Sequence, residues 1–203
     1  MNKTVEFLFD MGSPYSYLAY RHLPKMTQAK NARIIWTPVL LGGIFQATGN
    51  RSPAETPAKR LHLETDLQRW AKAYGTTYTA NPSFPINTLT LMRGAVALQL
   101  RDEAEFQRYL SVMFEAMFDK PQNLGDPAVL ARVLTLAGFD PQELLSLTQS
   151  QVVKDKLKAN TEHAIKRGVF GAPTFFVGTD MFWGQDRIDF VREALDAISI
   201  KPF

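Results

Sequence analysis

The stretch Phe9-Asp10-Met11-Gly12-Ser13-Pro14-Tyr15-Ser16-Tyr17-Leu18 lies where a short apolar strand gives way to a helix. The residues before it, Val5–Phe9, predict a buried strand, and apolar residues near helical spacing predict a helix over Pro14–Gln28. Ser13 followed by Pro14 is a typical helix start, and capping alone explains both residues. The same geometry sets the Ser13 hydroxyl beside the first free N–H groups of the helix, where a bound anion is favoured.

Outward from this stretch, Ala32–Thr37 predicts a second strand, which ends before Pro38. Strand, helix and strand at this length predict a βαβ unit with parallel, adjacent strands. After Leu40 the pattern becomes a loop over residues 42–53, with room for a helical turn, and then a helical block. The predicted helices of that block are Ala54–Tyr74, Leu89–Leu100, Glu103–Phe118, Asp126–Leu136, Pro141–Leu147 and Ser150–Arg167.

Strand character returns near the end of the chain. Pro173–Gly178 predicts a strand, Asp180–Trp183 its hairpin partner, and Ile188–Ile198 a closing helix. In Val169-Phe170-Gly171-Ala172-Pro173-Thr174 a proline opens the strand after a glycine and a small residue. This pattern matches the loop of thioredoxin-like folds in which the proline is cis, although a plain strand-entry proline also explains it. A cis-proline loop leaves the backbone of Ala172 unpaired by the sheet and available to an extended peptide.

The order βαβ, helical block, ββα predicts an α/β fold, in which a thioredoxin-like sheet is interrupted by an inserted helical domain. We expect residues 1–40 together with 168–203 to form the thioredoxin-like domain. Residues 41–167 are expected to form the inserted helical domain.

Composition excludes several classes of function. The chain has 203 residues and no cysteine, which rules out disulfide exchange, cysteine-liganded metals and a cysteine nucleophile. Its net charge of +3 comes from 23 basic and 20 acidic residues without a long basic run, so no nucleic-acid partner is expected. No apolar run approaches the ~20 residues of a membrane span, and Glu6 and Asp10 interrupt the apolar start. We therefore expect a cytoplasmic protein without a membrane partner, and the scattered histidines predict no metal site.

A third stretch, Phe182-Trp183-Gly184-Gln185-Asp186-Arg187, precedes the closing helix. Gln185 or Asp186 is placed to cap that helix, and a carboxylate there also suits a ligand ammonium group. Together the three stretches resemble the kappa-class glutathione transferase family and, within it, the bacterial 2-hydroxychromene-2-carboxylate isomerases. The resemblance covers nearly the whole chain. Its motifs are Asp10–Leu18, Gly49-Asn50, Asp66–Ala71, Phe84–Asn87, Val169–Thr174 and Trp183–Arg187.

The resemblance implies that glutathione, a γ-Glu-Cys-Gly peptide, is the cofactor. Its thiolate is expected to accept a hydrogen bond from the Ser13 hydroxyl, with the helix start favouring the charged form. Its cysteinyl backbone is expected to pair with Ala172. Ser13 is the expected catalytic residue, and the implied glutathione contacts are Ser13, Asn50, Ala172, Pro173, Gln185 and Asp186.

The implied reaction interconverts 2-hydroxychromene-2-carboxylate and trans-o-hydroxybenzylidenepyruvate in aromatic degradation such as naphthalene catabolism. Reversible thiolate addition makes the enone double bond single, allows rotation and regenerates glutathione. An aromatic carboxylate is thus the expected second partner, and the resemblance also implies a homodimer. The expected substrate contacts are Phe45, Trp70, Phe84, Asn87 and Trp183, with Arg51 or Arg93 as further polar candidates. For each aromatic residue, core packing is the alternative.

Two other functions remain open at this point. One is a kappa-like glutathione transferase or peroxidase that acts on other electrophiles. The other is a non-catalytic thioredoxin-fold module that binds peptides at the Pro173 edge. The second predicts no selectivity for glutathione among tripeptides and little effect of Ser13→Ala.

Overall fold

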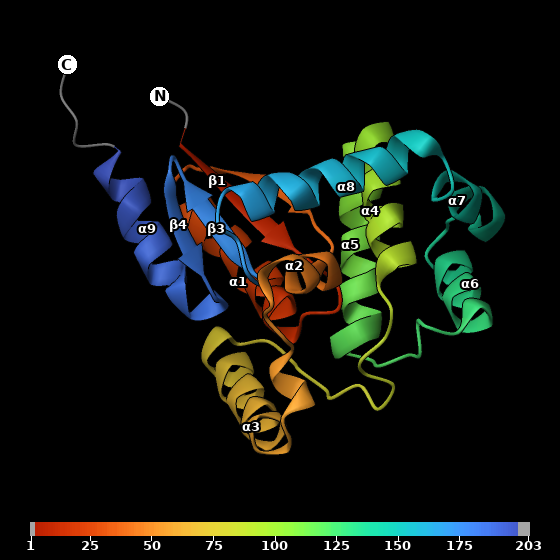
Figure 1. The fold of residues 1–203 in the computed structure, drawn as a ribbon, viewed down its shortest axis with the longest axis horizontal. Helices are drawn as coiled ribbons and strands as arrows, with labels where there is room; N and C mark the ends of the chain where they lie inside the picture. The colour runs from red at the N-terminus through yellow and green to blue at the C-terminus, as the bar shows by residue number, and fades with distance from the viewer. Residues whose placement is uncertain (1–2, 199–203) are drawn as a thin grey trace.

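A four-stranded mixed sheet joins the two ends of the chain in the computed structural model, which describes residues 3–198 (Figure 1). Its order is β2-β1-β3-β4. β1 and β2 pair in parallel, β3 runs antiparallel to β1, and β4 returns along β3 as a hairpin. The predicted βαβ unit and the terminal hairpin are therefore confirmed. The strands are β1 (Thr4–Phe9), β2 (Arg33–Pro38), β3 (Thr174–Val177) and β4 (Asp180–Trp183).

The helices follow the predicted order closely. Four of them have proline as their first residue. Proline is favoured there because the N–H group that it lacks would have no partner within the helix. The helices are α1 (Pro14–Ala29), α2 (Leu41–Thr48), α3 (Pro57–Tyr74), α4 (Leu89–Arg101), α5 (Glu103–Phe118), α6 (Pro127–Leu136), α7 (Pro141–Leu147), α8 (Gln151–Lys166) and α9 (Ile188–Ala197), with 3-10 turns at Pro53–Glu55 and Gln185–Arg187.

The 3-10 turn Pro53–Glu55 also begins at a proline, and it marks the main departure from the predicted helices. The predicted helix over Ala54–Tyr74 begins only at Pro57, because Ser52 caps the short turn and Thr56 is extended before the next proline. Most of the predicted loop over residues 42–53 is also wrong, since α2 occupies Leu41–Thr48. α2 packs on α8, and a Cβ on Gly43 would lie at van der Waals contact, 3.4 Å from Thr161 Cγ2 of α8.

Each face of the sheet is covered by helices. Phe7 and Phe9 of β1 face α1 and α9 and belong to the main core, in which the Phe7 ring lies 5.3 Å from that of Phe175 in β3. Leu8 points to the opposite face and packs with Ile44 of α2 and Ala164 of α8. This alternation is the pattern expected of a strand that is buried on both faces.

The helical block is joined to the sheet at several points. α8 contacts β2 at one end and α4 at the other, and Figure 1 shows it running from the sheet to the α4–α5 pair. Asn160 of α8 donates to the backbone carbonyl of Pro38 (3.0 Å), and Gln99 of α4 donates to that of Trp36 (2.7 Å). The division into domains at residues 40 and 168 stays a prediction, and its ends at residues 1–2 and 199–203 lie outside the described residues.

The structure also bears on membrane spans and metal sites. Among residues 3–198, no helix is long and apolar enough to cross a membrane. Over the same part of the chain, no group of three or more histidines and carboxylates is placed to hold a metal ion.

Candidate active site

Ser13 joins the two loops that meet at the end of the sheet. It is the N-cap of α1, where its Oγ accepts a hydrogen bond from the Ser16 N–H (3.1 Å). The same hydroxyl donates to the backbone carbonyl of Ala172 (3.0 Å). The Ala172–Pro173 peptide bond is cis, as the sequence predicts. β3 begins only at Thr174, so Ala172 stands outside the strand ladder, but its carbonyl is occupied by Ser13 rather than free.

The first turn of α1 leaves one backbone donor available. Pro14 has no N–H, the Ser16 N–H is capped by Ser13, and the Tyr17 N–H bonds to the Ser13 carbonyl (3.1 Å). Within residues 3–198 the Tyr15 N–H has no hydrogen-bond partner. Ser13 and Tyr15 thus present a hydroxyl and an N–H at a helix start, which is a favourable place for an anion.

Asp10 holds the turn that carries Ser13, a role that the sequence does not reveal. Its carboxylate accepts from the backbone N–H groups of Gly12 (2.8 Å) and Leu41 (2.8 Å), and its carbonyl accepts from the Ser13 N–H (3.0 Å). Asp10 as a whole residue is 1% exposed. Gly12 is needed here, because a Cβ would lie 2.9 Å from Thr88 Cγ2. Asp10 therefore ties β1, the Ser13 turn and the start of α2 together.

Burial raises the pKa of the Asp10 carboxyl above its ordinary value of 3.8, although its hydrogen bonds act in the opposite direction. Between pH 3.8 and this raised pKa the folded protein holds a proton that the unfolded chain has lost. Stability from this group is therefore greatest at low pH and falls as the pH rises through that window. Asp10→Asn cannot titrate. In urea unfolding, we expect the wild type to lose stability relative to Asp10→Asn as the pH rises from 3.8 through the raised pKa of Asp10. A difference that stays constant, or that moves the other way, would contradict this origin of the shift.

A pocket of about 1000 Å³ opens beside Ser13. One wall comes from the Ser13 turn with the start of α1, from the end of β4 and from the cis-proline loop. The other comes from α2, α3 and the chain between them. The predicted site residues that line it are Ser13, Phe45, Asn50, Trp70, Phe84, Ala172, Pro173, Trp183, Gln185 and Asp186.

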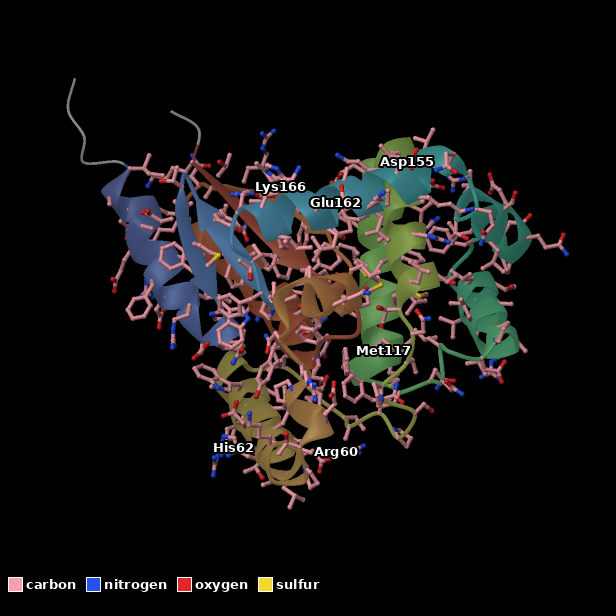
Figure 2. All side chains as sticks on the ribbon, viewed as in Figure 1. Arg60, His62, Met117, Asp155, Glu162 and Lys166 are labelled. Carbon is pink, nitrogen blue, oxygen red and sulfur yellow. The ribbon has the colours of Figure 1, made fainter. Side chains whose placement is uncertain are left out.

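Asn87 and Arg93 do not line this pocket. The Asn87 side chain instead accepts from the Leu89 N–H (3.0 Å) at the start of α4. Arg51 does line the pocket, and so does Lys59, which was not among the predicted residues. The neighbouring Arg60 and His62 of α3 are exposed outside this pocket (Figure 2).

Hydrogen bonds hold the α3 wall against the rest of the protein. Tyr15 donates from its hydroxyl to Asp66 of α3 (2.8 Å), and burial together with this carboxylate raises the pKa of the phenol. Tyr74, at the end of α3, donates to the backbone carbonyl of Gln185 (2.8 Å). Asn50 donates from its amide to the carbonyl of Phe170 (2.8 Å). The two walls are therefore fixed to each other on several sides of the pocket.

The segment after β4 does not cap the closing helix. Gln185 and Asp186 lie in a 3-10 turn, and α9 has Arg187 as its N-cap without a side-chain hydrogen bond. The Asp186 carboxylate pairs with Arg187 (2.6 Å). The capping interpretation of Gln185 and Asp186 is therefore wrong, and both residues line the pocket.

Trp183 is the most exposed aromatic residue of the pocket, at 48%. Its ring lies 4.9 Å from that of Phe170. A Cβ on Gly171 would lie 2.6 Å from the indole nitrogen, so glycine allows the indole to rest on the cis-proline loop. By contrast, Trp70 and Phe84 line the pocket and also pack against the main core, so core packing holds for both, and their contact with a substrate stays a prediction.

Comparison with known proteins identifies the family to which this fold belongs. The family profile of the DsbA-like thioredoxin domain matches residues 4–196. The chain belongs to this DsbA-like thioredoxin family. Its serine at the helix start, in a chain without cysteine, separates it from members that exchange disulfides.

Within the DsbA-like family, the chain is similar over nearly its whole length to two named groups. It is 32% identical to a 2-hydroxychromene-2-carboxylate isomerase of Pseudomonas putida, over 94% of this chain and 93% of the relative. It is 28% identical to glutathione S-transferase kappa 1 of Caenorhabditis elegans, over 94% of this chain and 90% of the relative. A solved structure of 2-hydroxychromene-2-carboxylate isomerase superimposes with a TM-score of 0.84 at 29% identity, over 97% of this chain and 96% of that one.

Proposed function

We propose that the protein is a glutathione-dependent isomerase that interconverts 2-hydroxychromene-2-carboxylate and trans-o-hydroxybenzylidenepyruvate. The observation that carries the proposal is the position of the Ser13 hydroxyl, at the start of α1, against Ala172 and inside the pocket. The isomerases and kappa-class glutathione transferases among its relatives support an activity of this type. A homodimer stays a prediction.

The residues of the pocket fit a thiol-bearing tripeptide. Ser13 and the Tyr15 N–H offer two donors to a thiolate, and Ala172 lies outside the strand ladder, where a peptide backbone can pair. Lys59 suits a terminal carboxylate, and Asp186 suits the ammonium group of the γ-glutamyl residue. Glutathione, when bound, supplies the thiolate that adds reversibly to the ring-opened enone.

The Ser13 hydroxyl has one proton and can donate it to either of two acceptors, the Ala172 carbonyl or a thiolate. Without a ligand the hydroxyl donates to the Ala172 carbonyl. Rotation about the Cβ–Oγ bond turns the same proton toward a thiolate, and the freed carbonyl then accepts from a peptide N–H. Because each lost hydrogen bond is replaced, this exchange avoids leaving a buried polar group unpaired. The Ser16 N–H continues to donate to Ser13 Oγ throughout, which keeps the oxygen in place.

The direct test is an isomerisation assay with purified protein. Interconversion of the two compounds is followed by absorbance with reduced glutathione, without a thiol, and with S-methylglutathione. We expect turnover only with reduced glutathione, because the methylated sulfur is no nucleophile. Turnover without any thiol would contradict the proposed role of glutathione.

A kappa-like transferase is the second candidate, because the Caenorhabditis elegans relative carries that name. It predicts that glutathione reacts faster with haloarenes or peroxides than with the chromene carboxylate. The same pocket serves both reactions, so rates on these substrate classes separate them. If glutathione binds no better than other tripeptides, a non-catalytic peptide-binding module remains instead.

A further inference from the structure

The charged side chains of the pocket differ in whether they already have partners. Each of its three carboxylates is engaged by a neighbour. Glu55 accepts from the Ser52 N–H, Asp66 from the Tyr15 hydroxyl, and Asp186 pairs with Arg187. The two cations, Arg51 and Lys59, have no carboxylate within 4.0 Å in the part of the chain that the structure describes. They are therefore the charged donors that remain available to a ligand.

Arg51 lines the same pocket as Ser13, from the segment between α2 and the 3-10 turn Pro53–Glu55. Its backbone N–H donates to Asn50 Oδ1 (2.8 Å), while the amide of Asn50 donates to the Phe170 carbonyl (2.8 Å). The backbone of Arg51 is thus anchored to the loop that contains Ala172. Lys59 reaches the same pocket from the first turn of α3. The two cations therefore approach the pocket from separately anchored segments.

We propose that Arg51 binds the carboxylate of the second substrate, so that the pocket selects electrophiles with a carboxylate near the reacting carbon. The inference rests on the proposed function and names the substrate class for that site. A guanidinium presents two parallel N–H donors to a planar carboxylate, whereas an ammonium group acts as a point charge. Arg51 therefore suits the flat oxo acid, and Lys59 is left for the flexible end of glutathione. Haloarenes and peroxides offer Arg51 no carboxylate.

The test compares trans-benzylidenepyruvate with its methyl ester, two enones that differ in the charge that Arg51 is proposed to bind. Glutathione addition to each is followed by loss of enone absorbance at saturating glutathione. We expect Arg51→Met to lower the acid-to-ester ratio of kcat/KM by about 10- to 100-fold, as for loss of a charged hydrogen-bonded pair. Arg51→Lys keeps the charge without the paired donors, so its ratio should fall between those of Arg51→Met and the wild type.

Arg69→Met is the matched control, because Arg69 is an exposed arginine of α3 outside this pocket. Its acid-to-ester ratio should equal that of the wild type. An unchanged ratio in Arg51→Met, or a raised KM for glutathione in place of a changed ratio, would overturn the assignment. If the wild type adds glutathione to neither compound, the proposed function fails. Calorimetric titration of the acid and the ester then still tests Arg51, since tighter binding of the acid must disappear in Arg51→Met.

Discussion

Ser13→Ala is expected to lower kcat/KM for glutathione-dependent isomerisation by about 10- to 100-fold at pH 7, because a charge-assisted hydrogen bond to the thiolate is lost. The variant should recover with rising pH, since a thiol with an ordinary pKa near 8.5 ionises without help. The pH profile of kcat/KM measures both effects. A loss of equal size at every pH would show that Ser13 acts through structure and not through the thiolate.

Ser16→Ala provides a matched control in the same helical turn. The Ser16 hydroxyl is buried and has no hydrogen-bond partner in residues 3–198, whereas its backbone N–H, which alanine keeps, is the group that Ser13 caps. We expect Ser16→Ala to keep the wild-type pH profile and stability. Ser13→Ala also removes an N-cap, which costs about 1 kcal/mol of stability. Its rates are therefore compared at a temperature where both variants are folded.

Gly94→Ala should destabilise the fold by about 2 kcal/mol, through overpacking and a lost hydrogen bond. Gly94 lies in α4 where α5 crosses it, and a Cβ there would lie 2.9 Å from Cζ of Tyr109, with the hydroxyl closer still. Tyr109 is buried, and its hydroxyl donates to the Leu91 carbonyl (3.0 Å). The added methyl group must displace this ring. Urea unfolding measures the change in free energy.

Gly42→Ala is the matched control for Gly94→Ala, because an added Cβ at Gly42 meets no neighbouring atom. Gly42 lies inside α2, and a Cβ added there would have no atom beyond its chain neighbours within 4 Å. Alanine is the better helix former by up to about 1 kcal/mol, so this variant should be as stable as the wild type or more stable. Equal destabilisation by both substitutions would contradict the close packing of α4 on α5 at Gly94.

Local patterns in the sequence were sufficient for the half of the site that the sheet carries. The strand before Ser13 and the proline after it predict one loop of the site. Gly171 and Pro173 predict the other loop. Both patterns follow from local backbone conformation, namely a helix start at Ser13 and a cis-proline loop at Pro173, and residues adjacent in the sequence determine such features. The pairing of β1 with β2 follows from the βαβ pattern, and that of β3 with β4 from the short turn between them.

The opposite wall depends on tertiary packing, which the sequence pattern does not show. The two glycines of α2 resemble a loop in the sequence, whereas in the fold this segment is a helix that packs on α8. Lys59 resembles any exposed helical lysine until α3 is placed over the pocket. The motif Phe84–Asn87 predicts Asn87 as a substrate contact, but its side chain accepts a hydrogen bond from the Leu89 N–H at the start of α4. Asp10 resembles an ordinary turn residue, and only its contact with the Leu41 N–H shows its wider role.

The central claim is that Ser13 holds the thiolate of glutathione, and calorimetric titration tests it most directly. Reduced glutathione is titrated into the wild type and Ser13→Ala, with S-methylglutathione as the control ligand. We predict saturable binding to the wild type that weakens when either the free thiol or the Ser13 hydroxyl is removed. No binding at millimolar glutathione, or equal binding of the methylated ligand and of Ser13→Ala, would contradict the account.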